Sequence, residues 1–97
     1  MIHIKAFHPA VEELVNKYAT VKDADYLADK LIEEMAELTQ ATIKYRISKN
    51  SVKFAELEGE FADVLVHMAL LQEKFMLIPD CKKRLEKVEK HYKEVVQ

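Results

Sequence analysis

The sequence predicts an all-α fold, in which one short helix and three longer ones form a bundle that is completed by oligomerisation. One glycine and two prolines in 97 residues leave little material for the tight turns of β-hairpins. Apolar residues recur at helical spacing in four segments that short polar breaks separate. The apolar share of 49% indicates a folded chain, and the length indicates a single domain over residues 1–97.

Caps and apolar spacing define the first two helices. Pro9 suits the first turn of a helix, and apolar residues follow it at a spacing of i, i+3, i+4 and i+7: Val11, Leu14, Val15 and Tyr18. Asp23 or Asp25 can cap a long second helix, which we expect from about Ala24 to Ile47. One stripe of that helix is apolar and predicts its buried face: Leu27, Leu31, Leu38 and Tyr45.

The third and fourth helices are separated by a proline. The loop 48–51 ends at Ser51, which can cap a third helix that reaches about Leu77. Pro79 ends this helix, and a fourth one follows Asp80 with four apolar residues at helical spacing: Leu85, Val88, Tyr92 and Val95. The two central helices carry more apolar surface than one chain of this size can cover, so we expect a homodimer or homotetramer.

Charge and composition exclude several classes of partner. The net charge of −2 argues against binding to a nucleic acid polymer or to an anionic membrane surface. The sequence has no apolar run of about 18 residues and no signal-peptide pattern in "MIHIKAFHPA", so we expect no membrane span. The single cysteine, Cys81, fits a reducing compartment and has no partner for an internal disulfide. We therefore expect a cytoplasmic protein.

Two groups of carboxylates lie where the apolar pattern predicts burial. On a helical wheel, Glu34 falls within the apolar face of the second helix, Glu37 falls at its rim, and Glu33 points away. On the third helix one narrow stripe of polar residues runs between apolar residues: Glu56, Glu60, Asp63 and His67. Asp63 interrupts "FADVLVHMALL", which otherwise reads as buried helix.

A divalent cation is the most complete way to stabilise such a group. Buried unpaired carboxylates are costly, and neighbouring like charges repel each other. Lys30 and Lys74 are the only bases near the two stripes, and protonation relieves one or two groups. Mg²⁺, or Mn²⁺ as the alternative, takes oxygen ligands and fits two facing i, i+3 carboxylate pairs. Di-iron bundles use Glu-x-x-His pairs, which this sequence lacks. The competing interpretation is a set of ordinary surface carboxylates.

The same residues carry a resemblance to a known family. "EEMAE" (33–37), followed later by "EFAD" (60–63) and "ADVLVHM", resembles the EExxE…ExxD signature of the MazG-like, all-α nucleotide pyrophosphohydrolases. The likeness covers roughly Ala24 to Lys93. It implies a dimer or tetramer of four- to five-helix chains. It also implies Mg²⁺-dependent hydrolysis of a nucleoside triphosphate to the monophosphate and pyrophosphate.

The resemblance also implies roles for individual residues. Glu34 and Glu37 match the first pair of metal ligands of the family, and Glu60 and Asp63 match the second pair. Glu33 matches the leading glutamate of the motif. Its position outside the apolar face suits either a part behind the metal ligands or a catalytic part in orienting the water.

Substrate contacts are less sharply defined. "KLIEE" and "DVLVH" resemble the related phosphoribosyl-ATP pyrophosphohydrolases, in which Lys30 and His67 have counterparts, so that activity is an alternative. His67 can be a ligand, a phosphate donor or only a hydrogen-bond partner of Asp63. On the fourth helix Leu85 stands where the family often has asparagine. The basic residues of this helix therefore have two interpretations, as phosphate contacts or as a solvated face: Lys83, Lys87, Lys90 and His91.

A non-catalytic helical interaction module is the alternative from a different functional class. Long apolar stripes would then bind partner helices, and the carboxylates would have no chemical role. The sequence does not name a base or a sugar for the substrate.

Overall fold

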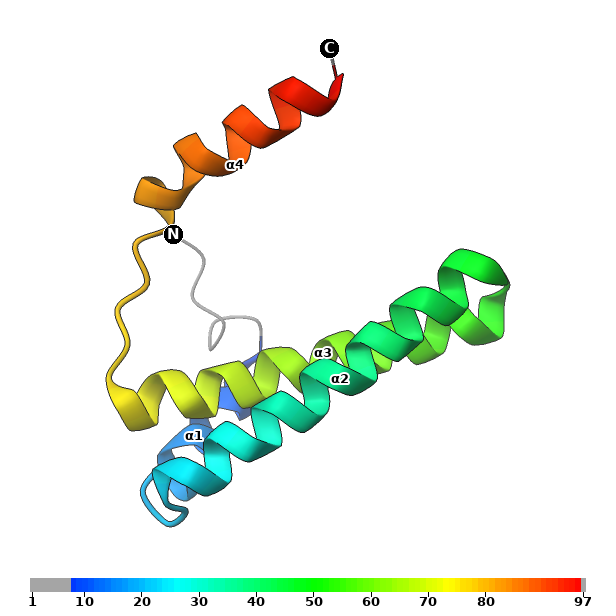
Figure 1. The fold of residues 1–97 in the computed structure, drawn as a ribbon. Coiled ribbons are helices and arrows are strands. Elements are labelled where there is room, and N and C mark those ends of the chain that lie inside the picture. Colours follow the sequence, from blue (N-terminus) through cyan, green and yellow to red (C-terminus); the bar gives the residue numbers. More distant parts are fainter. Residues whose placement is uncertain (1–7, 97) are drawn as a thin grey trace.

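The computed structural model describes residues 8–96, and this part of the chain contains four α-helices and no strand. They are α1 (Pro9–Tyr18), α2 (Ala24–Ile47), α3 (Ser51–Phe75) and α4 (Cys81–Val96). Figure 1 shows α2 and α3 side by side as a long antiparallel pair with a short turn between them. None of the described helices is long and apolar enough to cross a bilayer. The all-α class is therefore confirmed.

Local capping sets where the two long helices begin. Asp23 caps α2, because its Oδ1 accepts a hydrogen bond from the backbone N of Tyr26 at 2.7 Å. Asn50 caps α3, with its Oδ1 2.9 Å from the backbone N of Lys53. The prediction that Ser51 is the cap was wrong by one residue, because the asparagine side chain supplies the acceptor for that backbone N–H.

The end of α3 is set by a left-handed residue. Met76 has φ 53°, and the backbone N of Leu77 donates to the carbonyl oxygen of Gln72 at 2.9 Å. This pattern closes the last turn of a helix and directs the chain away from the helix axis. α3 therefore ends at Phe75, two residues before the expected Leu77.

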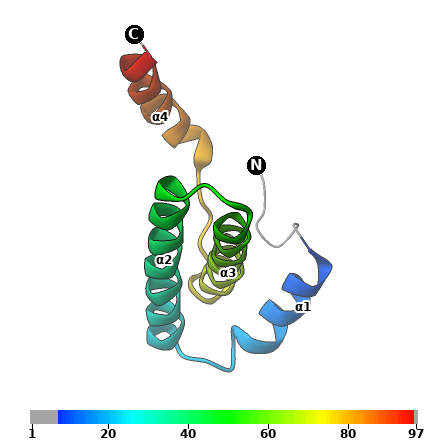
Figure 2. The same cartoon turned by 90° about the vertical axis from the view of Figure 1, so that its right-hand side faces the viewer.

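The hydrophobic core lies where three helices meet at one end of the α2–α3 pair. Figure 2 shows α3 between α2 and α1. The buried residues come from all three helices, with Val15 fully buried: Val15 and Ala19 of α1, Leu27 of α2, and Ala69 and Leu70 of α3. Farther along the pair, Tyr45 contacts Phe54, with ring centroids 5.5 Å apart. The rest of the expected stripe on α2 is only half-buried.

α4 stands apart from the other helices. No Cα of α4 comes within 8 Å of α1, α2 or α3, and every α4 side chain from Cys81 to Val95 is exposed. The radius of gyration is 15.7 Å, whereas a compact chain of this length has about 12.5 Å. Three helices therefore pack together within one chain, and the bundle completed by oligomerisation stays a prediction.

Candidate metal centre

The register of the α2–α3 hairpin brings the two carboxylate pairs to the same level. The Tyr45–Phe54 ring contact fixes which residues of the two antiparallel helices face each other. Glu37 lies eight residues before Tyr45, and the position eight residues after Phe54 falls between Glu60 and Asp63. A helix pair with equal rise per residue therefore places Glu37 opposite the second acidic pair.

Three carboxylates form a close group. One side-chain oxygen from each of Glu34, Glu37 and Glu60 lies within 4.8 Å of the others. Glu34 is buried, with 9% of its surface exposed, while the other two are half-buried. Carboxylate oxygens are the ligands that Mg²⁺ prefers, so three of them this close together could hold one cation.

Two oxygens of this group have no partner. The Oε2 atoms of Glu34 and Glu60 are buried and accept no hydrogen bond from any residue of the part that the structure describes. Buried polar atoms in folded proteins are almost always paired, so each orphan needs a physical explanation. A bound hard cation supplies one, because it would satisfy both oxygens at once. The residues present therefore fit a divalent metal.

Burial and like charge act together on the protonation of this group. Burial is the main cause that raises the pKa of Glu34, and the negative charge of Glu37 raises it further. The pKa of Glu60 is raised for the same two reasons in the same order. Glu37, which the helical wheel placed only at the rim, thus interacts with both Glu34 and Glu60. The register between α2 and α3 is the information that could have predicted this central position.

Asp63 lies outside the close group. Its side chain is exposed, although the wheel placed it beside apolar residues. Its charge still contributes to the raised pKa of Glu34 and of Glu60. In the core, α1 packs against Ala69 and Leu70, which lie nearer the C-terminal end of α3 than Asp63 does. The side of α3 that carries Asp63 is therefore left open. The structure thus brings together three of the four expected ligands.

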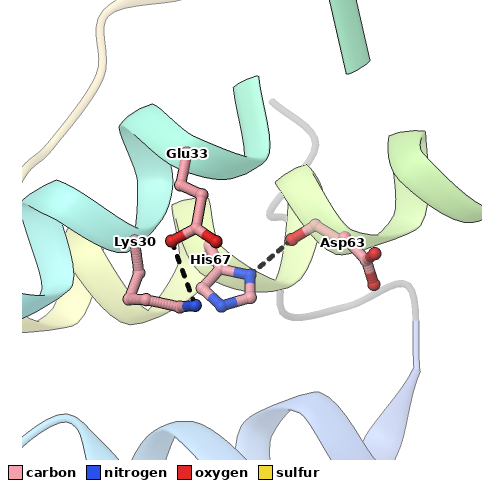
Figure 3. A network of polar contacts seen from close by, with 4 residues as sticks. All are labelled: Lys30, Glu33, Asp63 and His67. Atoms are coloured by element: carbon pink, nitrogen blue, oxygen red, sulfur yellow. Dashed lines mark hydrogen bonds and ion pairs between the residues drawn. The ribbon is translucent and has the colours of Figure 1, made fainter. Parts of the chain in front are cut away.

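His67 is fixed by a main-chain contact. Its Nδ1 lies 2.7 Å from the main-chain carbonyl oxygen of Asp63, and Figure 3 shows the Asp63 carboxylate pointing away from the imidazole. Because a carbonyl oxygen only accepts hydrogen bonds, Nδ1 carries the proton and Nε2 remains available. A histidine held in this way can offer Nε2 to a metal or, when protonated, to an anion.

Lys30 and Glu33, three residues apart on α2, form an ion pair. Their Nζ and Oε2 atoms are 3.3 Å apart, and Figure 3 marks this pair with a dashed line. The hydrogen bond to Glu33 is the main cause that raises the pKa of Lys30, so the ammonium stays charged at neutral pH. Glu33 is exposed, in agreement with its expected place outside the apolar face.

The remaining candidates do not join this group. Glu56 lies 3.5 Å from Lys53 in an exposed ion pair. The basic residues of α4 lie on a helix that contacts no other described helix, so within one chain they are not brought to the carboxylates: Lys83, Lys87, Lys90 and His91.

Comparison with protein-family models, with curated proteins and with solved structures finds no match to this chain. The resemblance to MazG-like enzymes therefore rests on the residues of the two motifs alone.

Proposed function

We propose that this protein is a Mg²⁺-dependent nucleoside triphosphate pyrophosphohydrolase, which converts its substrate to the monophosphate and pyrophosphate. The observation that carries the proposal is the group formed by Glu34, Glu37 and Glu60, with side-chain oxygens within 4.8 Å of one another. Two of its buried oxygens have no hydrogen-bond partner in the described part of the chain. A charged group that is close, partly buried and unsatisfied is typical of a functional site rather than of a solvated surface.

The three glutamates would hold the cation, and Asp63, one helical turn after Glu60, is the fourth candidate ligand. Mn²⁺ is the alternative to Mg²⁺, because both prefer carboxylate oxygens. When bound, such a cation neutralises charge on phosphate oxygens and acidifies water. No glycine-rich phosphate loop is present in the sequence, so the carboxylates are the proposed means of recruiting the triphosphate.

Three further side chains of α2 and α3 would position the reactants: Lys30, Glu33 and His67. Lys30 keeps its positive charge at neutral pH and can contact a phosphate oxygen if it exchanges its bond to Glu33. Glu33, released in the same exchange, can then accept a proton from the attacking water and orient it towards the α-phosphorus. His67 keeps Nε2 free for the substrate, because Nδ1 is held by the Asp63 carbonyl.

The proposal includes a homodimer or homotetramer. Within one chain the lysines of α4 lie away from the carboxylates, because α4 contacts no other described helix, so a phosphate contact from them would come from a neighbouring subunit. The exposure of the α4 side chains from Cys81 to Val95 is also the observation that favours the second candidate, a helical interaction module. Metal binding distinguishes the pyrophosphohydrolase from the interaction module, since the module has no need of a cation.

Two measurements test the proposal. Thermal unfolding with and without millimolar Mg²⁺ or Mn²⁺ should show stabilisation by metal, because the folded state alone presents the assembled ligands. The stabilisation by metal should be smaller in Glu60→Gln. Glu58→Gln is the matched control for this variant, since Glu58 is an exposed glutamate of the same helix that is not part of the close group. A flat response to metal in the wild-type protein would favour the module.

Activity should then be measured on a panel of canonical and modified nucleoside triphosphates that includes phosphoribosyl-ATP. Chromatography of the products identifies both the substrate and the bond that is cleaved. Metal-dependent stabilisation without hydrolysis of any member of the panel would contradict the enzymatic proposal.

A further inference from the structure

α4 is an amphipathic helix whose apolar side faces solvent. Leu85, Val88, Tyr92 and Val95 follow one another at i, i+3, i+7 and i+10, which is the spacing of a helix–helix seam. Their exposed fractions are 61%, 47%, 63% and 68%. These four residues are called the α4 seam below. A seam of this kind is normally covered by another helix, because exposed apolar surface is unfavourable.

α3 carries a second exposed apolar stripe. Phe54, Phe61 and Met68 repeat every seven residues, so they lie along one line of the helix. They are 47%, 55% and 40% exposed, and Phe61 lines a shallow apolar depression together with Leu57 and Leu65. These three residues, with that depression, are called the α3 seam. Glu60 does not lie on this line, so the seam is distinct from the candidate metal centre.

The connection between α3 and α4 directs α4 away from its own chain. Leu77 is tied to α3 by its hydrogen bond to the carbonyl of Gln72, after the left-handed Met76. Asp80 is tied to α4, since its Oδ1 accepts from the backbone N of Lys83 at 3.1 Å. Only Ile78 and Pro79 lie between; proline fixes its own φ angle and disfavours the helical conformation for Ile78 before it. The short connection and the two capped helix ends therefore limit how far α4 can turn back towards its own α3.

Surface area and charge both favour a second copy of the chain as the partner. The accessible surface is 7869 Å², whereas a folded monomer of 11.3 kDa exposes about 5,700 Å². The excess of about 2,100 Å² is larger than the roughly 800 Å² that each partner contributes to a standard interface. Residues 81–97 carry six Lys or Arg and three Glu, which gives +3 and leaves −5 on residues 1–80 of the −2 chain. Unlike charges of this kind steer two copies together.

We propose that the α4 seam of one chain docks on the α3 seam of a second chain, and that the exchange is reciprocal. The product is a two-fold dimer in which each α4 covers the partner's Phe54, Phe61 and Met68. Short, stiff connections favour such an exchange over packing within one chain. This inference does not depend on metal binding or on hydrolysis, so those parts of the proposed function can fail or succeed separately; the two share only the expectation of an oligomer.

Light scattering on purified variants tests the two seams. The wild-type protein should have a mass of 22.6 kDa, twice the 11.3 kDa of one chain. The double variant L85K/V88K, and separately Phe61→Lys, should each shift to 11.3 kDa at the same concentration. All three side chains are exposed in the single chain, so circular dichroism should show unchanged helix content. Glu94→Gln, on the opposite side of α4 from the seam, should stay dimeric.

Mixing the two monomeric variants distinguishes a second copy from the same chain. L85K/V88K keeps an intact α3 seam, and Phe61→Lys keeps an intact α4 seam, so their mixed dimer retains one of the two contacts. Mixing should therefore restore a 22.6 kDa species that neither variant forms alone. Monomers that stay monomeric after mixing would overturn the exchange, as would a wild-type monomer. A dimer that survives both sets of substitutions would place the interface elsewhere and would overturn it as well.

Discussion

Replacing Glu34 with glutamine should stabilise the metal-free protein and weaken its response to divalent cations. Glu34 is buried and shares a close group with two other glutamates, and its Oε2 accepts no hydrogen bond within the described part of the chain. Glutamine keeps the size of the side chain and removes one negative charge from the group. A surface glutamate would show neither effect, because substitutions at such positions change stability by about ±0.5 kcal/mol or less.

The magnitude follows from the spacing of the charges. Two unit charges 4.8 Å apart repel by about 0.9 kcal/mol even at the dielectric constant of water. Partial protonation already relieves some of this repulsion, because the pKa of Glu34 is raised by burial and by the charge of Glu37. We therefore expect a gain on the order of 1 kcal/mol without metal, which corresponds to a Tm about 4–8 °C higher for a domain of this size.

The metal response should change in the opposite direction. Metal at 100 times its dissociation constant stabilises a folded protein by about 2.7 kcal/mol, and a tenfold weaker site at the same concentration leaves about 1.4 kcal/mol. Thermal unfolding of both proteins with Mg²⁺ and with a chelator measures these terms, with Glu58→Gln as the control. A chelated variant that is less stable than the wild type, together with an unchanged gain from Mg²⁺, would refute the reasoning.

Three further predictions concern Asp63, pH and the core. Asp63→Asn should lower turnover at least 100-fold in a steady-state assay if Asp63 joins the glutamates around the cation; full activity would end its role as a ligand. In a chelator, the Tm of the wild type should rise as the pH falls from neutrality towards the ordinary glutamate pKa of 4.5. The reason is that, in this pH range, the folded chain keeps protons that the unfolded chain has lost. Glu34→Gln should make the dependence of Tm on pH less steep. A wild-type Tm that falls over this range, with the same dependence on pH as the variant, would contradict the prediction. Val15→Ala should cost about 2 kcal/mol in denaturant unfolding, because Val15 is fully buried where three helices meet, while Val21→Ala, at a site 69% exposed, should cost less than about 0.5 kcal/mol.

Local features of the sequence were enough to predict the helices. The bounds of α2 agree with the expected Ala24 to Ile47, because Asp23 supplies a cap and the apolar spacing continues to the loop. The burial of Glu34 was also predictable, since its direction depends only on the geometry of one helix.

Features that depend on neighbouring elements were not predictable in the same way. Asp63 is exposed because of where α1 crosses α3, which no periodicity in α3 encodes. The end of α3 depends on the left-handed conformation of Met76, a residue type that gives no such signal. The seven-residue spacing of Phe54, Phe61 and Met68 was visible in the sequence, but only the structure shows that all three remain exposed, although Phe54 contacts Tyr45 of α2.

Hydrolysis in H₂¹⁸O tests the central claim most directly, because the label marks the phosphorus that water attacks. The account predicts that, with Mg²⁺ present, the isotope enters the nucleoside monophosphate and the pyrophosphate is unlabelled, that chelation abolishes the reaction and that Glu34→Gln lowers its rate. Labelled orthophosphate released together with nucleoside diphosphate would move the attack to the terminal phosphorus and contradict the account. Equal activity in the presence of a chelator would contradict it too.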